Sequence, residues 1–166
     1  MIYFAYGSNL CLGRLRSRTP SASLLFTAKL IGYSLRFHKK SKKDNSGKAN
    51  AYRTNVNTDI VWGAVFAIDD KEKPALDQAE GLDKGYVLTN IQVIKEDQSV
   101  HNVCTYVAHI GSIDDNLKPY SWYKRFIVDG ARQLHLPQDY ILQIEAIIEI
   151  DDPDKKRAAV NLAIQC

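Results

Sequence analysis

The amino-acid sequence predicts an α+β fold built on a mostly antiparallel sheet that is long enough to curl into a small barrel or a strongly twisted roll. Apolar residues recur mainly at every second position within residues 1–110, and they change to the helical period from Ser121 onward. Parallel strand–helix–strand alternation is not seen, so strands and helices are segregated along the chain. With 166 residues, 45% of them hydrophobic, we expect a single domain over residues 1–166.

The first element is a short apolar strand that runs into a turn at Gly7-Ser8-Asn9. Ser8 or Asn9 can cap a helix that begins near Leu10 and must end before Pro20, and we expect its arginines to be solvated. A strand, a glycine turn and a helix start expose backbone N–H groups at the positive end of a helix dipole. Such a site suits a carboxylate or a developing oxyanion. The same residues also fit an ordinary capped turn without a ligand.

Strands and one polar segment follow. Residues 23–37 alternate around Gly32, which predicts one long strand or two strands joined at a bulge. Residues 38–48 contain one histidine, five lysines and nothing apolar, so we expect a mobile loop there. Its charge could attract an anion, but a solvated loop is the commoner explanation, because anion sites usually add aromatic residues or a glycine-rich cradle. Residues 49–54 predict another short strand.

Three more strands complete the predicted sheet. Residues 60–68 form a strand interrupted by Gly63. Residues 86–95 and 100–110 are separated by a short polar segment, which is typical of an antiparallel hairpin.

Between these strands a helix is predicted over residues 71–79, with Asp69 or Asp70 as its cap and Gly81 after its end. Glu80 therefore lies at the C-terminal end of the helix, where the dipole disfavours the ionised carboxylate. A carboxylate that accepts and releases protons readily is suited to general acid/base catalysis. An exposed glutamate without a role is the commoner outcome, and position alone does not distinguish the two.

The C-terminal part of the chain predicts helices. One begins at Ser121, Pro137 opens a second, and residues 155–164 form a third. The first of these helices carries more large apolar side chains than one helix face requires, namely Trp122, Tyr123, Phe126, Ile127 and Val128. Such a surplus often marks a partner interface, so we expect a C₂ homodimer. The alternative is that all these side chains lie in the core.

Composition excludes several classes. The net charge of +3, from 22 basic and 19 acidic residues, is too small to indicate nucleic-acid binding. Cys11, Cys104 and Cys166 lack paired spacing, so they indicate neither a disulfide framework nor a zinc site and favour a reducing compartment. No leader or membrane-length apolar run precedes the first strand, so we expect a cytoplasmic protein without membrane contact. The four histidines are scattered, and we expect no metal or other cofactor.

Four short motifs, which occur in order over residues 2–148, together resemble the gamma-glutamylcyclotransferase family. They are Tyr6-Gly7-Ser8-Asn9, Val61-Trp62-Gly63, the segment Asp-Gln-Ala-Glu-Gly at 77–81 followed by Gly85-Tyr86, and the run from Pro119 to Tyr140. The resemblance implies a small mixed, mostly antiparallel sheet closed into a barrel with flanking helices, and a homodimer. It implies an enzyme that converts gamma-glutamyl amino acids or peptides into 5-oxoproline and the free amino acid, without a cofactor.

The resemblance also assigns site residues. The family's first strand and turn bind substrate, and here they are Tyr3, Phe4, Ala5, Tyr6, Gly7, Ser8 and Asn9. The essential acid/base glutamate falls on Glu80, and a substrate-contacting tyrosine falls on Tyr123.

The chemistry that the family performs needs few groups. The α-amino nitrogen of a gamma-glutamyl substrate lies at five-ring distance from its own side-chain carbonyl, so the reaction is intramolecular. Glu80 would take a proton from the α-ammonium group and deliver one to the departing amine, while the turn at Gly7 and Ser8 would hold the carboxylate or the carbonyl oxygen. Two alternatives keep the fold: a cyclotransferase acting on gamma-glutamylamines, including isopeptides, and a catalytically inactive small-molecule binding protein.

Overall fold

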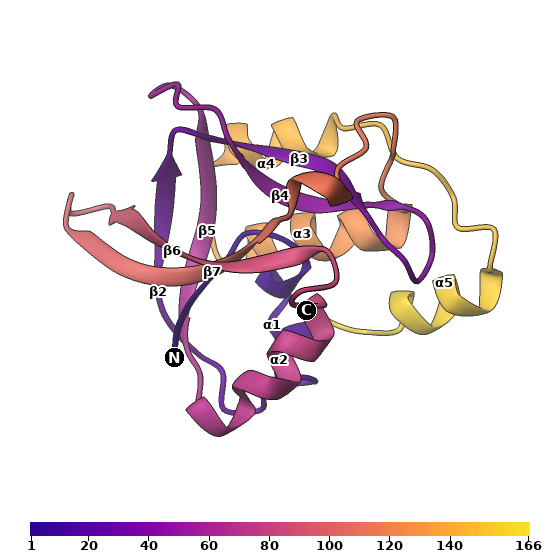
Figure 1. The fold of residues 1–166 in the computed structure, drawn as a ribbon, viewed down its shortest axis with the longest axis horizontal. Helices are drawn as coiled ribbons and strands as arrows, with labels where there is room; N and C mark the ends of the chain where they lie inside the picture. The colour runs from indigo at the N-terminus through magenta and orange to yellow at the C-terminus, as the bar shows by residue number, and fades with distance from the viewer.

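Five strands close into a barrel in the computed structural model, which describes residues Met1 to Cys166 (Figure 1). Their order around the barrel is β1-β5-β2-β6-β7, and their bounds are Ile2–Ala5 (β1), Ile60–Ala67 (β5), Ser23–Ile31 (β2), Tyr86–Lys95 (β6) and Val100–Ala108 (β7). Neighbouring strands are antiparallel except β1 and β7, which are parallel and pair at Tyr3 and Cys104. The predicted mixed, mostly antiparallel barrel is therefore confirmed.

A separate two-stranded sheet lies beside the barrel and consists of β3 (Tyr33–Lys40) and β4 (Gly47–Arg53). The run over residues 23–37 is thus two strands rather than one. They separate at Gly32, whose φ of 82° lies in the left-handed region that favours glycine. The chain leaves the barrel at this residue and enters the second sheet.

Residues 38–48, predicted as a mobile loop, comprise the end of β3 (38–40), the connection between the two strands (41–46) and the start of β4 (47–48). His38 is only 3% exposed, and its ring contacts Asp115 Oδ1 (2.6 Å) and Asn50 Nδ2 (2.9 Å). Lys39 is also buried. The loop prediction was therefore wrong at residues 38–40 and 47–48, because buried positions there hold polar side chains and no apolar period marks the strands.

Five α-helices flank the sheets in Figure 1: α1 (Leu12–Arg16), α2 (Lys73–Glu80), α3 (Ser121–Gln133), α4 (Gln138–Glu145) and α5 (Lys155–Leu162). Asp69 caps the 3₁₀ turn Asp70–Glu72 that leads into α2 rather than α2 itself, since its side chain accepts a hydrogen bond from the Lys71 N–H (2.9 Å). As predicted, Gly81 follows the end of α2, with φ 72°. Neither Ser8 nor Asn9 caps α1; both lie in a 3₁₀ turn that precedes it. No helix is long and apolar enough to cross a membrane.

Helix α3 packs its apolar face inside the single chain. The five side chains that suggested a dimer interface are each at most 6% exposed: Trp122, Tyr123, Phe126, Ile127 and Val128. The surplus apolar surface is therefore absent, and the alternative that these side chains belong to the core is correct. Gly130 allows α3 to approach the turn after β1, because a Cβ there would lie 2.4 Å from the carbonyl carbon of Leu10. Helix α3 therefore packs directly against this turn.

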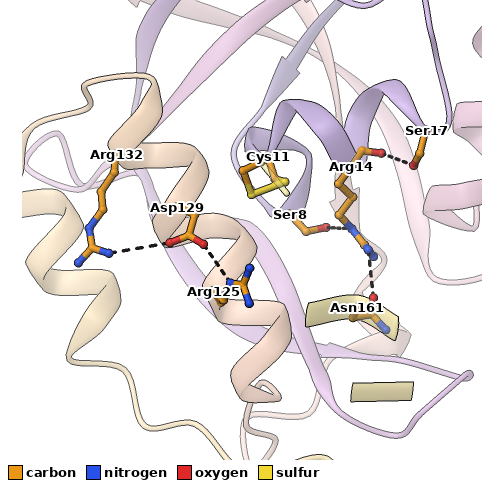
Figure 2. The surroundings of a disulfide bond; sticks show 9 residues. Ser8, Cys11, Arg14, Ser17, Arg125, Asp129, Arg132 and Asn161 are labelled. Atoms are coloured by element: carbon orange, nitrogen blue, oxygen red, sulfur yellow. Dashed lines mark hydrogen bonds and ion pairs between the residues drawn. A yellow bond between two sulfur atoms is a disulfide. The ribbon is translucent and has the colours of Figure 1, made fainter. Parts of the chain in front are cut away.

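The C-terminal tail is fastened to the start of α1 by a disulfide between Cys11 and Cys166 (Figure 2). Gly13 lets the tail lie directly on α1, since a Cβ there would be 2.1 Å from the carbonyl oxygen of Gln165. The expectation of unpaired cysteines was wrong, because a pair separated by 155 residues leaves no local spacing signal. The expectation of a reducing compartment rested on unpaired cysteines, so this disulfide removes its basis. Cys104 is not paired.

Candidate active site

A small pocket lies where the turn after β1 meets the C-terminal end of α2. Seven of the residues assigned to the site line it: Tyr3, Tyr6, Gly7, Ser8, Asn9, Glu80 and Tyr123. Phe4 and Ala5 do not line it, because both are fully buried in the core. Ala49, Tyr86 and Tyr106 also line the pocket. Tyr86 belongs to one of the four motifs but was not assigned to the site. Ala49 and Tyr106 lie outside the motifs, so no sequence signal pointed to them.

Glu80 is held at the rim of this pocket through one of its two oxygens. Its Oε1 accepts hydrogen bonds from Asn9 Nδ2 (2.9 Å) and Arg18 Nη1 (2.9 Å). Asn9 is itself fixed, because its Oδ1 accepts from Arg18 Nη1 (2.8 Å). The side chain of Glu80 is 16% exposed, and no group of the chain bonds Oε2. One carboxylate oxygen therefore stays available to a ligand.

Arg18 is the partner of Glu80 that the sequence analysis missed. The ion pair spans 62 residues, and the Arg18 side chain is only 19% exposed. The expectation that the arginines after the turn are solvated is wrong for Arg18 and for Arg14, whose guanidinium is largely buried. The guanidinium of Arg18 therefore lies in direct contact with the carboxylate at the end of α2.

The tyrosines of the pocket fall into two groups. Three hydroxyls donate within the chain: Tyr6 to the Tyr106 carbonyl (2.5 Å), Tyr86 to the Ala49 carbonyl (2.6 Å) and Tyr106 to Asp77 Oδ1 (2.6 Å). The hydroxyls of Tyr3 and Tyr123 only accept, from Asn9 Nδ2 (3.0 Å) and the Ala49 N–H (3.1 Å). Their own protons are free to donate to a ligand.

Burial keeps these free hydroxyls protonated. It raises the pKa of Tyr123 above its usual value and that of Tyr3 well above it, and the charge of Glu80 acts in the same direction on both. Tyr3 and Tyr123 are therefore hydrogen-bond donors at neutral pH rather than bases.

Gly7 contributes backbone rather than side chain to the pocket. Its N–H has no acceptor within the chain. A Cβ at this position would lie 3.3 Å from Ala49 Cβ and 3.7 Å from the Tyr123 hydroxyl, so a side chain would narrow the pocket. The pocket thus combines a carboxylate oxygen with a backbone donor and two hydroxyl donors. No three His, Cys, Asp or Glu side chains of the chain are grouped so that they could hold a metal ion.

Comparisons with known proteins give a consistent result. The AIG2-like family matches residues 60–144. A gamma-glutamylcyclotransferase of Mus musculus is 32% identical over 152 residues, which cover 88% of this chain and 78% of that protein. The gamma-glutamylcyclotransferase of Homo sapiens is 30% identical over 151 residues, with the same coverage of 88% and 78%.

The fold agrees as well. A solved structure described as a gamma-glutamyl cyclotransferase superposes with a TM-score of 0.86 at 27% identity, covering 97% of this chain and 96% of the other.

Proposed function

The chain belongs to the gamma-glutamylcyclotransferase family and is an enzyme of this type, and we propose that Glu80 is the general acid/base with which it cyclises gamma-glutamyl substrates to 5-oxoproline. The observation that carries the proposal is the free Oε2 of Glu80 in the same pocket as the unpaired N–H of Gly7. A proton acceptor and an anion-stabilising donor are the two groups that the reaction needs.

In the proposed reaction the α-ammonium group of the substrate gives a proton to Oε2 of Glu80. The amine nitrogen then attacks the γ-carbonyl carbon of the same residue, and a C–N bond closes the five-membered ring. The carbonyl oxygen becomes an oxyanion, which the N–H of Gly7 would stabilise. Collapse of this intermediate breaks the original amide bond, and Glu80 delivers its proton to the departing nitrogen. The ring nitrogen still carries two hydrogens after its attack, and it passes the second one through Glu80 to the released amine, which leaves as an ammonium ion. No water is consumed.

The hydrogen bonds around Glu80 support this role. Asn9 and Arg18 both bind Oε1, so they fix the carboxylate without occupying the oxygen that would move the proton. Asn9 Nδ2 also bonds the hydroxyl of Tyr3, whose own proton is free for the α-carboxylate of the substrate.

The test is a panel of substrates incubated with the purified enzyme: gamma-glutamyl dipeptides, glutathione and gamma-glutamyl-ε-lysine. We expect 5-oxoproline and the released amine in equal amounts from at least one member. Release from gamma-glutamyl-ε-lysine alone would identify an enzyme for gamma-glutamylamines, and failure on every member would favour a binding protein.

An acetylated substrate separates cyclisation from simple hydrolysis. When the α-amino group carries an acetyl group, the nitrogen cannot attack, so an enzyme that works by cyclisation must leave the compound intact. Amine release from N-acetyl-gamma-glutamyl-alanine would contradict the mechanism, because it requires water as the nucleophile.

We keep a C₂ homodimer as a proposal that now depends on the family resemblance alone, since the apolar side chains of α3 are buried within one chain. Light scattering should give twice the chain mass of 18.7 kDa, and a mass of 18.7 kDa at all concentrations would contradict it. The catalytic proposal does not depend on the result, because every residue that lines the pocket comes from one chain.

A further inference from the structure

The Glu80 pocket opens into a wider cleft that is strongly basic. The two share Ser8, Glu80, Tyr86 and Tyr123, so a ligand held at Glu80 must extend into the cleft. Eight lysine and arginine side chains line the cleft, against two acidic side chains, Asp44 and Glu80. This balance is local, because the whole chain has a net charge of only +3.

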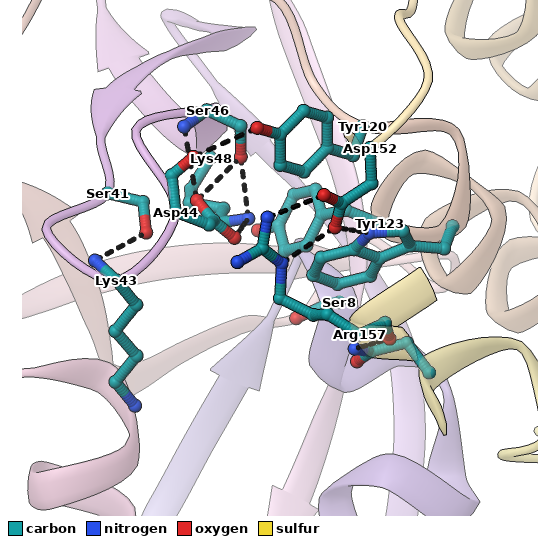
Figure 3. A network of polar contacts seen from close by, with 12 residues as sticks. Ser8, Ser41, Lys43, Asp44, Ser46, Lys48, Tyr120, Tyr123, Asp152 and Arg157 are labelled. Carbon is teal, nitrogen blue, oxygen red and sulfur yellow. Dashed lines mark hydrogen bonds and ion pairs between the residues drawn. The ribbon is translucent and has the colours of Figure 1, made fainter. Parts of the chain in front are cut away.

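Three of the eight cations are neutralised by carboxylates of the chain. Arg18 pairs with Glu80 (2.9 Å) and Lys48 with Asp44 (2.7 Å). Arg157 donates from Nε to Asp152 Oδ2 (2.7 Å). Figure 3 shows the last two pairs side by side at Tyr120 and Tyr123. These cations form part of the wall and have little charge left to offer a ligand.

Lys39 differs from Lys48, although both come from the same lysine-rich segment. It is 7% exposed, and no hydrogen bond or ion pair to its ammonium group exists within the chain. Its Nζ lies 4.6 Å from the centre of the Tyr86 ring, and a Cβ on Gly85 would lie 3.2 Å from it. Burial lowers the pKa of Lys39. A buried ammonium without an anionic partner is costly unless a ligand supplies one.

Arg14 is the second cation without a carboxylate partner. Its guanidinium contacts only neutral oxygens, Ser8 Oγ (3.3 Å) and Asn161 Oδ1 (3.3 Å), as Figure 2 shows, and it lies over the Phe126 ring at 4.5 Å. Burial lowers the pKa of Arg14 to about 10, and the charge of Arg18 acts in the same direction. The remaining N–H groups of its planar fork can bind a carboxylate.

Three exposed lysines, Lys42, Lys43 and Lys84, continue the same surface outward, and none of them has an ion-pair partner within the chain. The positive charge therefore runs from beside Glu80 to the mouth of the cleft. Such a gradient attracts anions and orients them with one end toward the pocket.

We propose that the leaving residue of the substrate is acidic, so that its side-chain carboxylate and its α-carboxylate are bound by Lys39 and Arg14. This inference rests on the proposed function and names its substrate class. A neutral leaving residue has a single carboxylate and leaves one of the two buried cations uncompensated. A gamma-glutamyl residue linked to glutamate or aspartate supplies both anions.

The test compares gamma-glutamyl-glutamate with gamma-glutamyl-glutamine, which have nearly the same size and differ by one charge. We expect kcat/KM to be about tenfold higher for the acidic dipeptide, the effect of one charge-assisted hydrogen bond. Gamma-glutamyl-lysine, which carries the opposite charge, should be the poorest of the three. Equal kcat/KM values for the glutamate and glutamine dipeptides would overturn the inference and leave the cyclotransferase proposal standing. No 5-oxoproline from any of them would overturn both.

Variants locate the effect. Lys39→Gln should reduce the preference for glutamate over glutamine severalfold, and Lys39→Arg should restore it, because the charge returns. Lys71→Gln is the matched control, since it removes the same charge from an exposed residue outside the cleft. A preference that survives in Lys39→Gln, or that falls equally in Lys71→Gln, would overturn the assignment of Lys39.

Discussion

Asp152 and Glu80 are both carboxylates with low exposure and an arginine partner, but the chain satisfies them differently. Asp152 Oδ2 accepts from Trp122 Nε1 (2.8 Å) and Arg157 Nε (2.7 Å), while Oδ1 accepts from Arg157 Nη2 (2.5 Å) and the Asp154 N–H (2.9 Å) (Figure 3). Glu80 is bonded only through Oε1, and no group of the chain bonds Oε2. A carboxylate bonded on both oxygens joins parts of a structure, whereas one bonded on a single oxygen can still exchange a proton with a ligand.

The difference follows from what each carboxylate connects. Asp152 ties α5, through Arg157, to α3, through Trp122, and so keeps the C-terminal region on the molecule. A buried charge in such a position must have all its lone pairs bonded, because every missing bond adds to the cost of desolvation. Glu80 lies at a pocket where a substrate can supply the missing partner.

Glu80→Gln should produce the largest effect of these substitutions, a loss of activity. A small effect would contradict the distinction between Glu80 and Asp152. The amide keeps the shape and can still bond Asn9, but it cannot carry a proton between nitrogen atoms. We expect 5-oxoproline formation to fall by at least ~10². Glu96→Gln, at an exposed glutamate, is the control and should leave the rate unchanged. Near-normal turnover in the folded Glu80→Gln protein would remove Glu80 from the mechanism.

Asp152→Ala should act on stability instead. The substitution leaves the Trp122 N–H and the Arg157 guanidinium without their acceptor, so the free energy of unfolding should fall by about 3 kcal/mol. Urea denaturation measures the change. Asp151→Ala is the matched control, because the neighbouring Asp151 side chain is 84% exposed and should matter by less than ~0.5 kcal/mol. If both variants lose the same free energy of unfolding, the buried hydrogen bonds of Asp152 do not stabilise the protein more than an exposed carboxylate does.

Acid should weaken the Asp152 network within a defined pH range. The hydrogen bonds from Arg157, followed by those from Trp122 and Asp154, lower the pKa of Asp152 from 3.8 to about 2. Because the folded-state pKa lies below the unfolded one, the stabilisation is complete above about pH 4–5 and is lost as the pH falls toward 2. The stability difference between wild type and Asp152→Asn should shrink over this range. A difference that is independent of pH would contradict the assignment.

Tyr123→Phe should give the smallest of these effects and would sharpen the description of the pocket. It removes a hydroxyl whose proton is free for the substrate, and the loss of one neutral hydrogen bond lowers kcat/KM about fivefold. Tyr140→Phe is the control, since Tyr140 is buried but lies outside the Glu80 pocket. If the two variants have equal kcat/KM, the hydroxyl of Tyr123 does not contact the substrate.

Much of the fold and part of the site could be predicted from the sequence. The change from period two to the helical period at Ser121 separated strands from helices, and Gly81 marked the end of α2. Glu80, Tyr123 and the turn at Gly7, which the motifs assigned to the site, do line one pocket. Their catalytic roles stay predictions. These features depend on each residue and its near neighbours in the chain, which a sequence displays directly.

Contacts between distant residues were decided only by the tertiary structure. No local pattern relates Arg18 to Glu80 or Cys11 to Cys166, although the structure joins both pairs. Nor does any local pattern show that Lys39 is buried without a partner. The α3 side chains looked like surplus surface for the same reason, because one helix does not show how much of it the rest of the chain covers. Periodicity indicates which face of a helix or strand is buried. The partner of a buried charge, in contrast, comes from a distant segment that only the closed barrel places beside it.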